Sequence, residues 1–171
     1  MRHKGIVIHC SDSNYGDANI IDSWHQERDF KRSNKYINKF YPLKHIGYHF
    51  VILNGYIDNS KDYVSELDGY IQYGRALGEV GSHAIGNNED VGICLIGKKE
   101  FSNHQIIQLY TLCLKLMLDL RIEYSAIIGH YETKYERNKP APKTCPNIGM
   151  NRVRTRLNAV QTQAINYLLQ I

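Results

Sequence analysis

The chain has 171 residues, of which 43% are hydrophobic and 22% are charged, and its formal net charge at pH 7 is +4. This length predicts one domain with a continuous core, and no apolar run is long enough to cross a bilayer. The modest positive charge, without a dense Lys/Arg block, disfavours nucleic-acid binding and suits an anionic polymer such as a bacterial cell wall.

The N-terminal apolar run, residues 5–8, is too short for a signal-peptide core and is followed by no small-residue cleavage site. We therefore expect synthesis in the cytoplasm. The four cysteines lie far apart in the sequence, and without a secretory signal we expect them to be free thiols: Cys10, Cys94, Cys113 and Cys145.

The first part of the chain alternates strand and helix patterns. A β-branched run predicts a buried strand over residues 4–10 that ends at His9 and Cys10. Apolar residues at helical spacing follow, and Asn19 is the expected N-cap of that helix. Strands and helices that alternate in this way are typical of an α/β domain.

A second strand is predicted from alternating residues within 44–55, which places Tyr48 and His49 on opposite faces. The polar segment 54–67 reads as an insertion inside a hairpin, and Asp68-Gly69 carries a turn signal.

The second half predicts four further elements. They are a strand at 91–96, a helix that Ser102 and Gln105 open as a capping box, a short strand at 125–129, and an amphipathic helix at about 151–170. The whole order predicts a single α/β domain, residues 1–171, with a central mixed β-sheet flanked by helices on both faces.

Three of the four prolines, Pro140, Pro142 and Pro146, fall within seven residues around Lys143 and Cys145. Proline fixes φ and has no amide hydrogen to donate, so this stretch can be neither a helix interior nor a central strand. It predicts a stiff loop that presents a lysine and a cysteine in fixed positions.

Three potential metal ligands stand at the ends of separate elements: His9, His130 and Cys145. Zinc binds imidazole and thiolate tetrahedrally, and three protein ligands leave one position for water, as in catalytic sites. Taken singly, each histidine is also consistent with an ordinary polar residue at a strand end, and Cys145 with a small packed side chain. Spacing alone leaves both interpretations open.

Seven separated segments, in order and in register from about residue 5 to residue 150, strengthen the metal interpretation: VIHCS, SWHQE, IGYHFVI, VGSHAIGNN, VGICLIG, GHYE and PKTCP. In these segments the chain resembles the zinc-dependent N-acetylmuramoyl-L-alanine amidases of the peptidoglycan-recognition-protein superfamily, and most closely the phage endolysins among them. The resemblance implies an amidase fold and one Zn²⁺ per chain.

The resemblance also implies roles for individual residues. His9, His130 and Cys145 match the zinc ligands of the family, and Tyr48 and Lys143 match its two catalytic residues. His83, in a loop that borders the substrate groove in the family, is a candidate substrate contact, with a local structural hydrogen bond as the equal alternative. Cys94 stands where some relatives carry a glutamate, so we expect Tyr48 to take more of the proton transfer.

The implied reaction is hydrolysis of the amide between N-acetylmuramic acid and L-alanine in peptidoglycan, by a phage or prophage endolysin that lyses the cell after release. The expected partner is the muramyl stem peptide, bound by a monomer without nucleic acid or membrane insertion. The alternatives are a non-catalytic peptidoglycan-binding module, a muropeptide-recycling amidase and an exported toxin amidase. A regulatory role on an RNA polymerase finds no supporting residue pattern.

Overall fold

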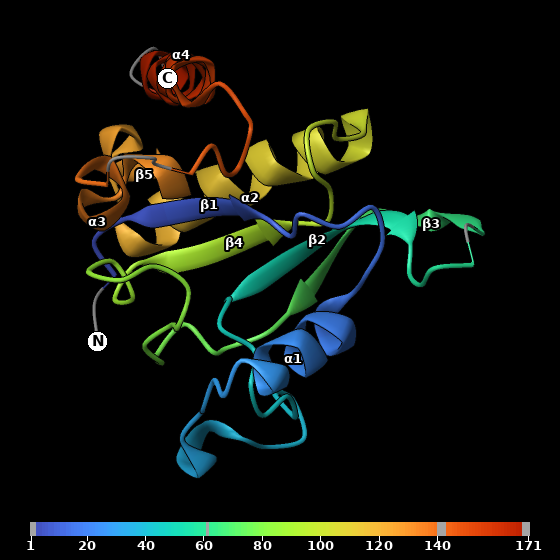
Figure 1. Cartoon of the computed structure of the whole chain (residues 1–171). Helices are drawn as coiled ribbons and strands as arrows, with labels where there is room; N and C mark the ends of the chain where they lie inside the picture. Colours follow the sequence, from blue (N-terminus) through green and yellow to red (C-terminus); the bar gives the residue numbers. More distant parts are fainter. Residues whose placement is uncertain (1–2, 61, 140–142, 169–171) are drawn as a thin grey trace.

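The computed structural model describes residues 3–60, 62–139 and 143–168, and its centre is a five-stranded sheet with the order β3-β2-β4-β1-β5 (Figure 1). The strands are β1 (Ile6–Cys10), β2 (Phe50–Tyr56), β3 (Tyr63–Tyr73), β4 (Val91–Leu95) and β5 (Ile127–Gly129). All neighbours pair in parallel except β3, which is antiparallel to β2. The sheet is therefore mixed, as predicted.

Helices cover both faces of this sheet (Figure 1). The helix α1 (Ala18–Glu27) packs on one face, where Ile21 joins a small apolar cluster with Val51 of β2. The helices α2 (Asn103–Leu120) and α4 (Met150–Leu168) pack on the other face over the larger core. A short helix α3 (Lys134–Arg137) and three 3-10 turns, η1 (Asn34–Tyr36), η2 (Tyr124–Ala126) and η3 (His130–Glu132), complete the structure.

Local sequence patterns explain the positions of β1, β4 and α2. Every residue of β1 and β4 is buried, which accounts for their mostly apolar sequences at the centre of a covered sheet. The predicted capping box opens α2, since the Ser102 hydroxyl accepts from the Gln105 amide and the Gln105 side chain accepts from the Ser102 amide.

The expected N-cap of α1 was wrong by two residues. Asp17, not Asn19, caps the helix, because Asp17 has an extended backbone and its carboxylate accepts from the Ile20 amide at 2.8 Å. The Asn19 side chain donates to the other Asp17 oxygen at 3.1 Å. Asp17 and Asn19 are both favourable capping residues, and only the backbone geometry shows which of them is the N-cap.

The predicted hairpin is present as β2 and β3, but its connection lies elsewhere than expected. Because β2 runs to Tyr56 and β3 starts at Tyr63, most of segment 54–67 is paired strand, and residues 57–62 connect the two strands. The turn expected at Asp68-Gly69 lies inside β3 instead. Gly69 has a φ of +82° at the point where the pairing of β2 and β3 shifts register. Glycine adopts this backbone conformation without strain and so permits the irregular pairing.

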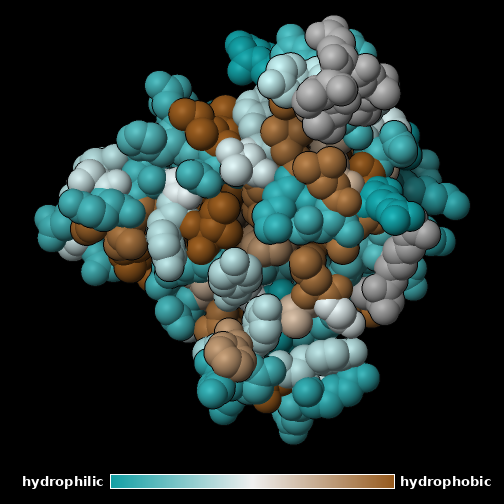
Figure 2. All heavy atoms as spheres, turned by 180° about the vertical axis from the view of Figure 1, so that it is seen from behind, coloured by the Kyte–Doolittle hydropathy of each residue, from teal (hydrophilic) through white to brown (hydrophobic). Residues whose placement is uncertain are grey.

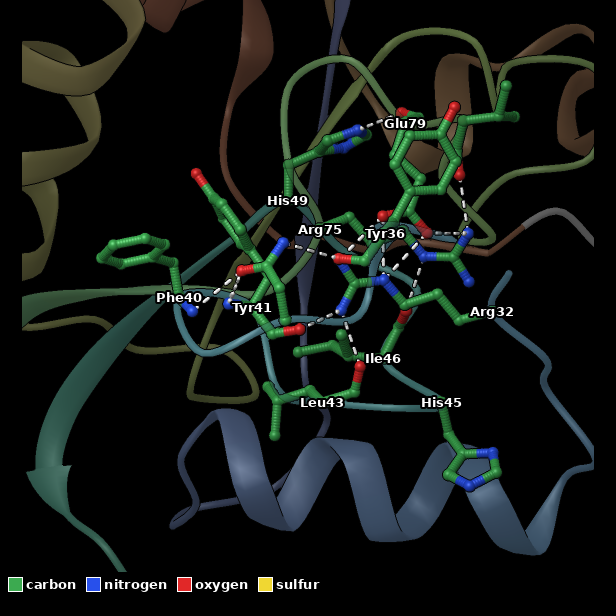
Figure 3. Close-up of polar contacts among 12 residues, drawn as sticks. Arg32, Tyr36, Phe40, Tyr41, Leu43, His45, Ile46, His49, Arg75 and Glu79 are labelled. Atoms are coloured by element: carbon green, nitrogen blue, oxygen red, sulfur yellow. Dashed lines mark hydrogen bonds and ion pairs between the residues drawn. The ribbon is translucent and has the colours of Figure 1, made fainter. Parts of the chain in front are cut away.

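A buried ion cluster fixes the segment that follows α1 (Figure 3). Glu79 lies between two arginines, with Arg32 Nε at 2.9 and 2.8 Å from its carboxylate oxygens and Arg75 Nη1 at 3.4 Å. Arg32 also donates to the Leu43 carbonyl at 2.6 Å, and Arg75 to the Ile46 carbonyl at 2.6 Å. The cluster ties residues 31–46 to the loop after β3.

The surface on the side away from the view of Figure 1 carries apolar side chains in several separate groups among polar ones (Figure 2). Among the described residues, none of the helices is long and apolar enough to span a bilayer.

Candidate metal centre and pocket

The fold brings three potential metal ligands together at one edge of the sheet. His9 lies near the carboxyl end of β1, His130 follows the neighbouring parallel strand β5 directly, and the register pairs Ile8 with Gly129. The ligand atoms of His9, His130 and Cys145 all lie within 4.8 Å of one another. The loop that bears Cys145 is held there by the Cys10 amide, which donates to Cys145 Sγ at 3.2 Å.

Burial keeps both imidazoles neutral. His9 is 1% exposed and His130 is 9% exposed. Burial lowers the pKa of His9 well below its usual value, and the neighbouring His83 lowers it further. Burial and then the Lys143 ammonium lower the pKa of His130 to about 4, against an opposing effect of Glu136. Neutral imidazole is the form that binds a metal ion, so both rings are ready to do so at neutral pH.

Cys10 and Cys145 share a hydrogen bond, so one thiol ionises more easily than the other. Without a metal this bond lowers the pKa of Cys10 to about 7 and raises the pKa of Cys145. A metal ion bound to Cys145 would reverse the order, because a coordinated thiol is deprotonated outright. The backbone amide that Cys10 donates to Cys145 Sγ favours a thiolate on Cys145, in agreement with a ligand role.

Tyr48 stands beside this cluster, in the segment before β2, with its ring 5.0 Å from that of His9. The predicted strand begins too early, since β2 starts only at Phe50. Burial raises the pKa of the Tyr48 hydroxyl well above its usual value, with a further contribution from Cys94. The phenol therefore keeps its proton at neutral pH.

Lys143 is exposed at the mouth of the site, and its charge lowers the pKa of both His9 and His130. Buried Glu136 anchors the preceding segment through a 2.8 Å ion pair with Lys139. Pro140 and Pro142, expected to stiffen this loop, lie outside the described residues.

His83 lines the cavity, and both of its ring nitrogens have partners within the protein. Its Nδ1 is 3.1 Å from His9 Nε2, and its Nε2 is 3.1 Å from the Asp90 carbonyl oxygen. Burial lowers the pKa of His83 to about 4.

Tyr48, His83, His130, Lys143 and Cys145 line a cavity of about 780 Å³. Its wall includes residues that sequence reasoning did not assign to the site: Ser11, Asp12, Trp24, His25, Arg28 and Phe30. His25 accepts from the Gly47 amide at 2.9 Å and stacks on Phe30. Helical periodicity places Trp24 and His25 on α1 but carries no signal that this end of the helix forms a pocket wall.

The donor set itself indicates which ion the site suits. Two neutral imidazoles and one thiolate are the ligands of zinc and related soft-to-borderline ions, whereas magnesium and calcium prefer oxygen. His9, His130 and Cys145 therefore fit a zinc ion with one position left open.

The chain is similar to phage endolysins in sequence, and in structure to N-acetylmuramoyl-L-alanine amidases and peptidoglycan recognition proteins. No family model matches the chain. The endolysin of Escherichia phage T7 is 28% identical over 160 residues, which cover 86% of this chain and 82% of the relative. The N-acetylmuramoyl-L-alanine amidase LysC of Clostridium intestinale superposes with a TM-score of 0.68 at 24% identity, over 92% of this chain and 87% of LysC. The chain has the amidase fold.

A Drosophila peptidoglycan recognition protein, PGRP-LB, in complex with tracheal cytotoxin shares this amidase fold with a TM-score of 0.55 at 19% identity, over 85% of this chain and 78% of the other. The expected family resemblance is thus confirmed for the fold, in sequence relatives that are phage endolysins and in structures of both amidases and recognition proteins.

Proposed function

We propose that this chain is an N-acetylmuramoyl-L-alanine amidase that acts as a phage or prophage endolysin, hydrolysing the amide between N-acetylmuramic acid and L-alanine in peptidoglycan. The observation that carries the proposal is the cluster of His9, His130 and Cys145, whose ligand atoms lie within 4.8 Å of one another. His130 and Cys145 also line one cavity together with Tyr48 and Lys143. The endolysin relatives and the amidase neighbours support it. We include in the proposal one zinc ion per chain and action as a monomer on the cell wall.

In this proposal His9, His130 and Cys145 hold the zinc ion. When bound, zinc supplies the Lewis-acid chemistry that makes water a usable nucleophile at neutral pH. The protein contributes neutral imidazoles, since burial has already lowered the pKa of both histidines, and a loop that the Cys10 amide holds in place.

Lys143 has the role of stabilising negative charge on the carbonyl oxygen of the scissile amide. A fixed positive charge aimed at an oxygen that becomes anionic is among the strongest catalytic devices, because it interacts more with the transition state than with the substrate. This role is supported by the cavity, which Lys143 lines together with His130 and Cys145.

Tyr48 has the role of assisting proton transfer. Its raised pKa keeps a hydrogen on Oη at neutral pH, so that it can hydrogen-bond the attacking water and assist proton transfer toward the leaving nitrogen. Among the described residues that line the cavity, Asp12 is the one carboxylate, and Cys94 stands in β4 behind Tyr48. Tyr48 therefore carries more of the proton transfer than it would beside a glutamate.

The decisive experiment digests purified peptidoglycan with the full chain, with and without a chelator, and analyses the products by mass spectrometry alongside the metal content of the protein. We expect free stem peptides that begin with L-alanine, one zinc per chain, and loss of cleavage on chelation. Peptidoglycan that is bound but left intact by the zinc-loaded protein would contradict the amidase and favour a binding module.

A further inference from the structure

The imidazole of His83 occupies a slot that two glycines create. A Cβ atom on Gly81 would lie 2.4 Å from His83 Cδ2, and one on Gly92 would lie 2.5 Å from the same atom. Any side chain at either position would collide with the ring. The loop adds a further restraint, because the Asn88 side chain accepts from the His83 amide at 2.8 Å. The ring is therefore held in one place by the surrounding backbone.

The hydrogen-bond partners of His83 determine which of its nitrogens carries the proton. Its Nε2 faces the Asp90 carbonyl at 3.1 Å, and a carbonyl oxygen can only accept, so Nε2 must donate. A neutral imidazole has a single N–H, so once Nε2 donates to Asp90, Nδ1 of His83 presents a lone pair.

That lone pair faces His9 Nε2 at 3.1 Å. His9 Nε2 must then carry a hydrogen, and the lone pair of neutral His9 is left on Nδ1. We propose that His83 is a positioning residue that holds His9 in the Nε2–H tautomer, so that Nδ1 is the atom His9 offers to the metal. Metal-bound histidines commonly donate their second nitrogen to such an outer partner, which fixes both tautomer and ring orientation.

This inference rests on the proposed metal site and changes the role expected for His83. Both of its nitrogens are engaged inside the protein, with His9 and with Asp90, so no polar atom of the ring is left for substrate. His83 acts on the reaction through His9.

The first test is the tautomeric state of His9 in the metal-free full chain, measured by NMR correlation of the ring carbon-bound hydrogens with the two ring nitrogens. We expect a protonated Nε2 and an unprotonated Nδ1 on His9, and the same assignment on His83. A proton on Nδ1 of His9 would overturn the proposal. Because this measurement uses the unaltered protein, it is decisive even if a variant fails to fold.

The second test is zinc affinity, measured by competition with a chromogenic chelator. His83→Ala should weaken zinc binding by about 10- to 100-fold, the usual effect of removing an outer partner. His83→Asn, whose amide oxygen can accept from His9, should retain most of the affinity. His104→Ala is the matched control, since His104 is an exposed histidine on α2 that pairs with Asp68.

Equal zinc affinity of His83→Ala and His104→Ala would overturn the proposal. Neither test involves peptidoglycan, so a chain that binds zinc through a correctly held His9 but cuts nothing would contradict the proposed function and leave this inference standing.

Discussion

Replacing Glu79 with glutamine tests whether the buried ion cluster holds the segment 31–46 in place. The substitution keeps the shape of the side chain and removes its charge. The side chains of Arg32 and Glu79 are 0% and 3% exposed, and that of Arg75 is 6% exposed, so both arginines lose their buried counter-charge. The remaining partners of both guanidinium groups are mainly backbone carbonyls, which do not neutralise them.

Removing one partner of a buried ion pair costs about 3–5 kcal/mol, because the other charge stays desolvated without compensation. For a domain of this size each kcal/mol lowers the melting temperature by about 2–4 °C. We therefore expect Glu79→Gln to lower the free energy of unfolding by about 3–5 kcal/mol and Tm by roughly 6–20 °C. Urea and thermal unfolding of the full chain measure both.

Asp119→Asn is the matched control. Asp119 pairs with Lys115 at 2.7 Å on α2, but their side chains are 48% and 69% exposed, so we expect a change below about 0.5 kcal/mol. If Glu79→Gln were no more destabilised than Asp119→Asn, the reasoning about burial and charge in this cluster would be refuted.

Three other changes give clear expectations. Cys145→Ser should lose zinc and peptidoglycan cleavage together, because a hydroxyl is a poor zinc ligand; one zinc per chain in this variant would exclude the thiolate from the site. Lys143→Ala should keep its zinc and lose cleavage by about 10²- to 10³-fold in kcat, as when an oxyanion donor is removed, and an unchanged kcat would remove the lysine from the mechanism. Stability of the metal-free chain should fall on acidification, because burial lowers the pKa of His49 to about 3 in the folded state. The unfolded chain then binds the extra proton, so this stability is complete above about pH 6.5 and decreases toward pH 3. Between pH 7 and pH 5 the decrease from His49 is about 2 kcal/mol, measurable by urea unfolding, and equal stability at the two pH values would contradict it.

The sequence predicts those parts of the fold that local patterns determine. Short runs of mostly apolar residues locate β1 and β4, because strands covered on both faces need apolar residues at most positions. The Ser102 and Gln105 pair marks the start of α2, because a capping box is complete within four residues. The proximity of His9 and His130 was also predictable. Both stand at strand ends, and neighbouring parallel strands end at the same edge of a sheet.

Features that depend on distant partners were missed. Arg32, Arg75 and Glu79 are ordinary surface residue types in a linear reading, and only the tertiary fold removes their charges from water. The turn signal of Asp68-Gly69 was misread because glycine serves an irregular strand as well as it serves a turn. The slot around His83 needs Gly81 and Gly92 to approach one ring from different segments, which no local pattern contains.

The contact between Cys10 and Cys145 joins positions that are 135 residues apart in the chain. An ion held by His9 and Cys145 would act as a cross-link between the first strand and the loop that leads into α4. Cross-links that close long loops remove the most conformational freedom from the unfolded chain. The free zinc concentration would then set how long the protein survives unfolding and proteolysis as well as how fast it works, so that one ion would control both its lifetime and its turnover.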